Sequence, residues 1–238
     1  MILHVEKKQL VAPGEIVAEG GYFAGDNVYK ENDRIFASRI GLVDVVGNRV
    51  LVVPIKGCYV PYVEDPVIGR IVDIGMSGWS VDINAPYPAL LPASETFGHR
   101  QPFPKADLTK IFDVGDLVLA KVIAFDRTRD PLITVKGPGL GKATSGRVVE
   151  ISPTKIPRLI GRKGSMISML KKETGCQIMV GQNGIVLVSG KSSENERVAV
   201  SAIYMIEREA HTRGLTDRIQ EMIRKEFGGR EFVSGKAS

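Results

Sequence analysis

Residues 159–167, LIGRKGSMI, decide how the C-terminal part of this chain folds. Apolar pairs flank a four-residue turn, residues 161–164, whose two glycines permit a tight bend and close approach of another backbone. We expect a helix to begin at Ser165, and a helix N-terminus favours an anion. Arg162 and Lys163 add positive charge at the tip of the turn. Together these features suit the binding of a sugar-phosphate backbone.

The elements around this turn follow from hydrophobic periodicity. We predict strands over 146–151, 177–180 and 185–188, and helices beginning at Ile156 and covering 165–174, 193–213 and 215–227. The resulting order is β-α-α-β-β-α, followed by one more helix.

The positive charge of the chain is concentrated in the same region. The chain has 238 residues and a formal net charge of +5, and residues 138–238 hold 17 basic against 10 acidic side chains. Residues 1–64 and 65–137 each carry a net charge of −1. Between 142 and 172, Glu150 is the one acid among eight cations: Lys142, Arg147, Lys155, Arg158, Arg162, Lys163, Lys171 and Lys172. A phosphate-binding surface would show such an excess, and so would a solvated face without a partner.

The glycine turn, its flanking helices and the element order together resemble a KH domain of the eukaryotic type, over about 143–213. In that family the turn grips the RNA backbone and an apolar groove takes the bases. The resemblance implies these RNA-binding residues: Lys155, Arg158, Ile160, Gly161, Arg162, Lys163, Gly164 and Ser165. The groove would draw on Ile156, Ile160, Ile167 and Ile178, although each isoleucine alone is more typical of a core.

The middle region, 65–137, alternates apolar and polar residues over 67–74, 79–84 and 117–125, and a last strand is expected at 132–136. An irregular, proline-containing stretch covers 85–113. About five strands, one long loop and no strong helix predict a small Greek-key barrel of the OB type. The sequence GPGLG at 137–141 predicts a linker.

This barrel is similar to the S1-type RNA-binding domain. The similarity rests on Gly69, Val72, Ile74, Trp79, Val81, Leu90, Leu91, Pro92, Ser94, Gly115, Asp116, Val118, Ala120, Lys121, Val122, Asp126, Leu132 and Lys136. The family stacks bases on aromatic side chains of the barrel. Trp79 occupies a position where an aromatic is expected, and the alternative for Trp79 is a core side chain. At Pro92 the chain departs from the family, which often has a histidine there. The predicted phosphate contacts are Arg100, Lys105, Arg127 and Arg129.

The first region, 1–64, has short β-branched segments separated by Gly- and Pro-containing turns, which predict a small β-sandwich or barrel. It contains no group of residues arranged for catalysis or ligand binding, so we expect this domain to have a docking role. The fold class is therefore α+β with three domains: residues 1–64, 65–137 and 138–238.

The order of the three domains resembles the RNA-binding cap subunit of the archaeal exosome, the ribosomal RNA-processing protein 4 family. Residues 11–15, VAPGE, and 20–22, GGY, resemble the N-terminal segment of that family. The resemblance implies single-stranded RNA as ligand and three cap copies on a hexameric ring of RNase-PH-like subunits. The barrels would surround the pore, the N-terminal domains would make most of the ring contact, and phosphorolysis would belong to the ring.

Other classes of protein fit the sequence less well. Cys58 and Cys176 are isolated and the three histidines are scattered, so we predict no disulfide framework, no metal site and no cofactor. No apolar run approaches the ~20 residues of a membrane span, and the N-terminus lacks a signal-peptide core, so we expect a cytoplasmic protein.

Two alternative functions remain open at this point. An RNA-cleaving enzyme could use distant carboxylates such as Asp73 and Asp82, but the chain has no catalytic motif, and solvated carboxylates are far more common. A stand-alone S1/KH protein, such as an RNA chaperone or a translation-associated protein, would have the same binding chemistry with different partners.

Overall fold

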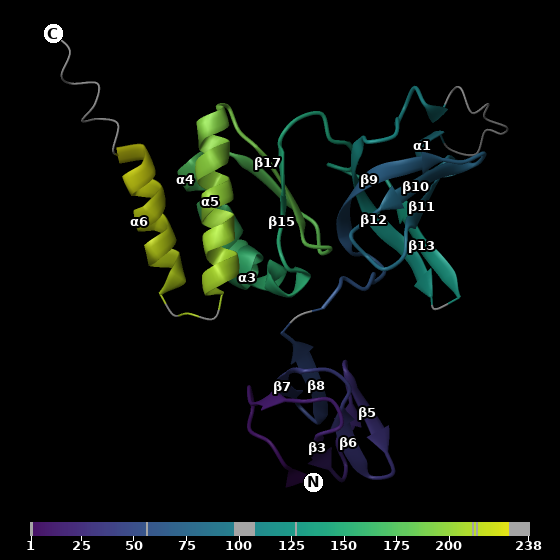
Figure 1. Ribbon diagram of the computed structural model, residues 1–238, viewed down its shortest axis with the longest axis vertical. Coiled ribbons are helices and arrows are strands. Elements are labelled where there is room, and N and C mark those ends of the chain that lie inside the picture. The colour runs from purple at the N-terminus through teal and green to yellow at the C-terminus, as the bar shows by residue number, and fades with distance from the viewer. Residues whose placement is uncertain are drawn as a thin grey trace. The chain divides into compact units, whose positions relative to one another are not determined.

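The computed structural model describes residues 2–55, 57–97, 108–126, 128–210, 212 and 214–228. The chain divides into two compact units, Met1–Gly57 and Cys58–Ser238. The second unit contains a strand-rich barrel and a mixed helix–strand domain (Figure 1). The predicted α+β multidomain fold is confirmed, whereas the predicted domain boundaries stay predictions.

The first unit is the expected small β-sandwich. One sheet has the order β1 (Ile2–Leu3), β3 (Ile16–Glu19), β6 (Arg34–Ala37) and β5 (Val28–Glu31). The other has the order β2 (Leu10–Val11), β7 (Gly41–Val46), β8 (Arg49–Pro54) and β4 (Phe23–Ala24). Alternate residues of both sheets form one core, whose buried members are Val5, Val11, Val17, Ala18, Ile35, Ala37, Val43, Val50 and Val52.

The predicted OB-type barrel is present at the start of the second unit. Its sheet has the order β13 (Arg129–Thr134), β11 (Ala89–Pro92), β10 (Gly78–Asp82), β9 (Pro66–Ile74) and β12 (Leu117–Asp126), and a β12–β13 pairing closes it. The core is built from side chains that alternate along these strands, such as Trp79 and Val81 on β10.

Three short elements of the barrel were not predicted. Strand β11 and helix α1 (Ser94–Phe97) lie in the stretch expected to be irregular, and both have only four residues. Strand β14 (Gly141–Lys142), at the end of the predicted linker, pairs with β12. Elements this short carry no periodicity, so the sequence pattern gave no signal for them.

The third domain confirms the β-α-α-β-β-α order. Its elements are β15 (Arg147–Glu150), the 3₁₀ turn η1 (Pro153–Lys155), α3 (Ile156–Ile160), the 3₁₀ turn η2 (Arg162–Gly164), α4 (Ser165–Thr174), β16 (Gln177–Val180), β17 (Ile185–Ser189) and α5 (Ser193–Glu209). The sheet order is β15-β17-β16, and helix α6 (Leu215–Gly228) packs beside α5 (Figure 1).

A buried asparagine joins this domain to the barrel. Asn183, in the turn between β16 and β17, has no exposed area. Its Oδ1 accepts the N–H of Ile68 at 3.3 Å, and its Nδ2 donates to the carbonyls of Ile68 at 2.7 Å and Ile83 at 2.9 Å. A Cβ on Gly181 would lie 2.2 Å from that Oδ1, so the turn requires glycine there.

Two further hydrogen bonds support the same junction. The N–H of Gln182 donates to the carbonyl of Pro66 at 2.8 Å, and the Asn84 side chain donates to the carbonyl of Asn183 at 3.1 Å. The oxygen and the nitrogen of the Asn183 side-chain amide both have hydrogen-bond partners. A buried polar group that is fully hydrogen-bonded in this way makes a specific contact.

Candidate nucleic-acid interface

The glycine turn 161–164 has the backbone geometry that its sequence predicts. Helix α3 ends at Gly161, which has φ +75° and ψ 175° and donates its N–H to the carbonyl of Pro157 at 3.0 Å. A Cβ at Gly161 would lie 2.8 Å from both the nitrogen and the Cβ of Met166. Only glycine fits there without displacing the start of α4.

The tip of this turn presents free positive charge. Arg162 and Lys163 are exposed, and neither has an ion pair with any residue that the structure describes. Gly164 is the N-cap of α4 and offers no side-chain acceptor to the first N–H groups of that helix. Ser165, the first helical residue, is exposed. A helix N-terminus without a side-chain cap and two exposed cations together can hold a phosphate.

Ion pairs neutralise part of the basic stretch 142–172 and leave its unpaired exposed cations near the turn. Lys142 pairs with Asp116, and this hydrogen bond lowers the pKa of the Asp116 carboxyl. Arg147 pairs with Glu196 at 3.2 Å. Within the described ranges, the exposed cations of 142–172 that have no ion pair are Arg162, Lys163, Lys171 and Lys172. The concentrated charge is therefore on the turn and on the following helix α4.

The other residues predicted beside the turn differ in their surroundings. Lys155 is half-buried at the N-cap of α3, and Ile160 is partly buried against the domain core. Arg158 is half-buried and donates to the carbonyl of Thr212 at 3.2 Å, beyond the end of α5. This contact joins α3 to the segment after α5, and the predicted phosphate contact of Arg158 stays a prediction.

The predicted apolar groove is smaller than expected. Ile156 and Ile178 are core residues with at most 2% exposure, whereas Ile160 and Ile167 are only partly buried. The described side chains that a base could reach are therefore Ile160 and Ile167.

Trp79 is a core residue, so the prediction that it stacks on RNA is wrong. Its side chain has no exposed area, its Nε1 donates to the carbonyl of Phe112 at 3.0 Å, and its ring meets the Phe112 ring edge-on at 5.3 Å. The physical reason is the alternation of β10, which turns Trp79 and Val81 into the barrel. No face of the indole is left for a base.

The barrel cations are only partly described. Arg129 has an exposed side chain and pairs loosely with Asp126 at 3.8 Å. Arg100, Lys105 and Arg127 lie outside the described residues.

Sequence reasoning missed an exposed tyrosine of the barrel that packs against a half-buried phenylalanine. Tyr87 lies between β10 and β11 and is 51% exposed, and its ring centroid is 6.1 Å from that of Phe125 on β12. The signal in the sequence was an aromatic residue between two prolines, Pro86 and Pro88.

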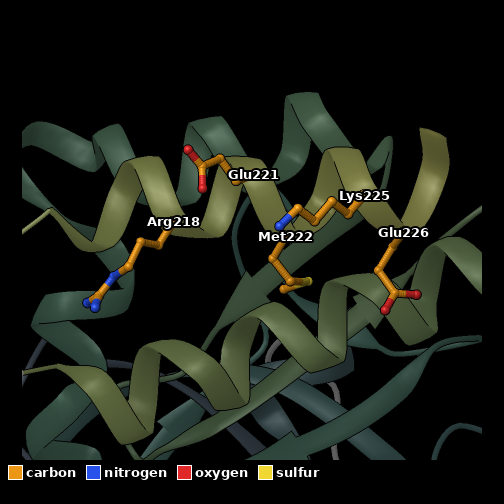
Figure 2. Close-up of a pocket in the computed structure, with 5 residues that line it drawn as sticks. All are labelled: Arg218, Glu221, Met222, Lys225 and Glu226. Atoms are coloured by element: carbon orange, nitrogen blue, oxygen red, sulfur yellow. The ribbon is translucent and has the colours of Figure 1, made fainter. Parts of the chain in front are cut away.

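Helix α6 carries a shallow surface depression that is unsuited to a polyanion (Figure 2). Its lining has both signs of charge: Arg218, Glu221, Met222, Lys225 and Glu226. Two of these side chains already pair with α5, Arg218 with Glu209 at 2.9 Å and Glu226 with Arg197 at 2.8 Å.

Among the described residues, no group of three or more His, Cys, Asp or Glu side chains is arranged to hold a metal ion. No helix in the described ranges is long and apolar enough to cross a membrane.

Comparison with protein families gives one consistent match for each domain. Residues 8–56 match the N-terminal domain of the exosome RNA binding protein RRP4, residues 58–124 match the RRP4 S1 domain, and residues 146–205 match the KH domain.

Individual proteins match over nearly the whole chain. The chain is 46% identical over 222 residues to the exosome complex component Rrp4 of Methanobrevibacter smithii, covering 93% of this chain and 73% of that protein. It is also 46% identical over 224 residues to the Rrp4 component of Thermofilum pendens, covering 93% and 94%. A crystal structure described as that of a candidate exosome complex RNA-binding protein superposes with a TM-score of 0.68 at 46% identity, covering 73% of this chain and 99% of the other.

Proposed function

Because this chain belongs to the Rrp4 family of exosome components and has an S1 and a KH RNA-binding domain, we propose that it is the RNA-binding cap of an exosome. It captures single-stranded RNA and guides the 3′ end to the central pore of a ring of RNase-PH-like subunits, which degrades it from 3′ to 5′. Three copies sit on each hexameric ring, in the cytoplasm, and the cap itself cuts nothing.

The observation that carries this proposal is the free charge of the glycine turn. Arg162 and Lys163 are exposed without an ion pair among the described residues, next to the uncapped N-terminus of α4. Such a site binds the repeating phosphates of any sequence, which is what a component that feeds diverse RNAs into a pore needs.

The first unit offers a surface for the ring. Leu10, Leu42 and Val53 are direct cross-strand neighbours on β2, β7 and β8, and they are 52%, 39% and 45% exposed. Ile40 and Ile55, next to the ends of β7 and β8, are exposed too. Contiguous exposed apolar side chains mark protein-interaction surfaces, which supports docking through this sheet face.

The first experiment tests the turn in the full-length chain assembled with its ring. Arg162→Glu with Lys163→Glu should weaken the binding of single-stranded RNA and lower the slope of log affinity against log salt by about one to two. The control is Arg224→Glu with Lys225→Glu on α6, which makes the same change in charge at two other exposed positions. Equal RNA affinity of the first variant and the wild type at moderate salt would count against the turn.

The second experiment tests assembly and the absence of catalysis. Labelled RNA is incubated with the chain alone, with phosphate or with magnesium, and then with the ring added. We expect product only with the ring, and a complex of several hundred kilodaltons by light scattering. Product from the chain alone would indicate an enzyme, and a chain that binds RNA but no ring would indicate the stand-alone S1/KH protein.

A further inference from the structure

Tyr87, an exposed aromatic of the barrel that packs on Phe125, suggests a second contact for RNA, given the RNA-binding function proposed above. Tyr87 and Phe125 have ring centroids 6.1 Å apart with planes inclined by 43°. Phe125 is half-buried and packs against the barrel core, whereas Tyr87 is 51% exposed. Phe125 thus anchors the pair, and Tyr87 is left with ring surface open to solvent.

The chain holds Tyr87 in a restricted conformation. Pro86 and Pro88 flank it, and proline limits both its own backbone and that of the residue before it. Within the described part of the chain, the Tyr87 hydroxyl has no hydrogen-bond partner. A ring fixed before binding loses little entropy when a ligand stacks on it.

A cation that can bind a phosphate lies near Phe125 in the β12–β13 ladder. Asp126 follows Phe125 and lies opposite Arg129 in the β12–β13 ladder. Its carboxylate accepts hydrogen bonds from the N–H and the hydroxyl of Thr128, which leaves Arg129 at 3.8 Å with 79% of its side chain exposed. An exposed ion pair this loose has little stability, so a phosphate can displace the carboxylate.

On the outer face of the barrel next in sequence, Leu90 has two uncharged cross-strand neighbours. Leu90 on β11 is 41% exposed and lies opposite Ser80 on β10 and Leu132 on β13. Strands β10 and β11 correspond to strands 2 and 3 of the OB fold, whose outer face is used for oligonucleotides. With Trp79 turned inward, Tyr87 is the exposed aromatic nearest in sequence to this face.

We propose that Tyr87, supported by Phe125, stacks on an unpaired base of single-stranded RNA while Arg129 binds an adjacent phosphate. Stacking needs only the flat face of a base, so this contact adds affinity without selecting a sequence. The ligand is therefore the same strand that the glycine turn holds by its phosphates.

The test combines a protein variant with an RNA variant in the full-length chain. Tyr87→Ala should weaken the binding of a single-stranded oligonucleotide by about 5- to 150-fold, whereas Tyr87→Phe should keep most of the affinity. Oligonucleotides with one abasic nucleotide at successive positions are then compared. At the stacked position the wild type should lose affinity and the Tyr87→Ala variant should lose none further, because the two changes remove the same contact.

The controls separate this inference from its alternatives. Tyr204→Ala, at an exposed tyrosine of α5, should bind RNA like the wild type. Wild-type affinity of Tyr87→Ala, or an abasic effect of equal size in both proteins, would overturn the stacking contact and leave the proposed function standing. Loss of ring assembly with unchanged RNA affinity would assign Tyr87 to a protein contact instead. A wild type that binds no RNA would overturn both proposals.

Discussion

The glycine turn of the KH domain turns its charged side chains outward, whereas strand β10 of the barrel turns its large aromatic inward. Arg162 and Lys163 are exposed, and Trp79 has no exposed area and is hydrogen-bonded to Phe112. A site that grips phosphates can be built from four consecutive residues. A site that stacks bases depends on which face of a strand points out, and closure of the whole barrel decides that.

The two domains also differ in whether their exposed cations are paired with carboxylates. In the described part of the barrel, Lys121, Arg129 and Lys136 pair with the carboxylates of Glu64, Asp126 and Glu95, whereas exposed Arg70 donates to the carbonyl of Gly115 at 3.2 Å. Within the residues that the structure describes, the cations of the turn and of α4 have no ion pair. We therefore expect the KH domain to supply most of the salt-dependent binding and the barrel to supply an uncharged contact.

Replacing Trp79 should have the largest effect on stability. It tests whether the barrel aromatic has a structural role while the glycine turn binds RNA. Trp79→Ala removes a fully buried ring and is expected to lower the free energy of unfolding by about 3–5 kcal/mol, measured by denaturant titration. Trp79→Phe keeps a ring but loses the hydrogen bond to Phe112, so its loss should be smaller. A Trp79→Ala variant of unchanged stability with weakened RNA binding would restore the stacking role and break the comparison.

Replacing Asn183 tests the junction between the two domains. Asn183→Ala leaves the N–H and carbonyl of Ile68 and the carbonyl of Ile83 without their partner, which should cost about 2–3 kcal/mol of unfolding free energy. Amide exchange at Ile68 should become faster. Gln182→Ala is the matched control, because Gln182 contributes its backbone N–H to the junction. Equal stability of the two variants would show that the Asn183 amide does not hold the domains together.

The sequence predicted the fold best where the signals are local. Helix α4 was expected over 165–174 and found there, because Gly164 and Gly175, both with positive φ, mark its two ends. Strand β16 was likewise predicted with its observed bounds. The two-residue strands β1, β2 and β4 were missed, because they exist through pairing with strands elsewhere in the chain. The four-residue β11, which pairs with β10 and β13, was too short to show a periodic pattern.

The same distinction between local and long-range signals applies to the candidate site. The glycine turn could be predicted because its geometry, its charge and the helix N-terminus beside it all depend on consecutive residues. The inward direction of Trp79 and the role of Asn183 could not, because both depend on partners more than 30 residues away along the chain. The contact of Arg158 with Thr212 could not be predicted for the same reason, since Thr212 comes after α5.

The smallest expected effect concerns a cation of the basic stretch that is not free. Lys142 pairs with Asp116, and this hydrogen bond lowers the pKa of the Asp116 carboxyl. A carboxyl whose pKa is lowered by folding stabilises the folded state above its unfolded pKa of about 3.9, and the contribution disappears as pH falls through the lower folded value. Asp116→Asn should therefore be less stable than the wild type at pH 7, by at most about 1 kcal/mol, and the difference should vanish near pH 2.

Thermal unfolding of the two proteins at both pH values measures this difference, since the other titrating carboxyls are common to both. Lys142→Met should lose a similar amount at pH 7, and the double variant should lose little more than either single one. Neither change should alter the salt dependence of RNA binding, because Lys142 is already neutralised within the protein. A lower salt slope for Lys142→Met would mean that RNA displaces Asp116, and the barrel would then share the phosphate-binding role with the glycine turn.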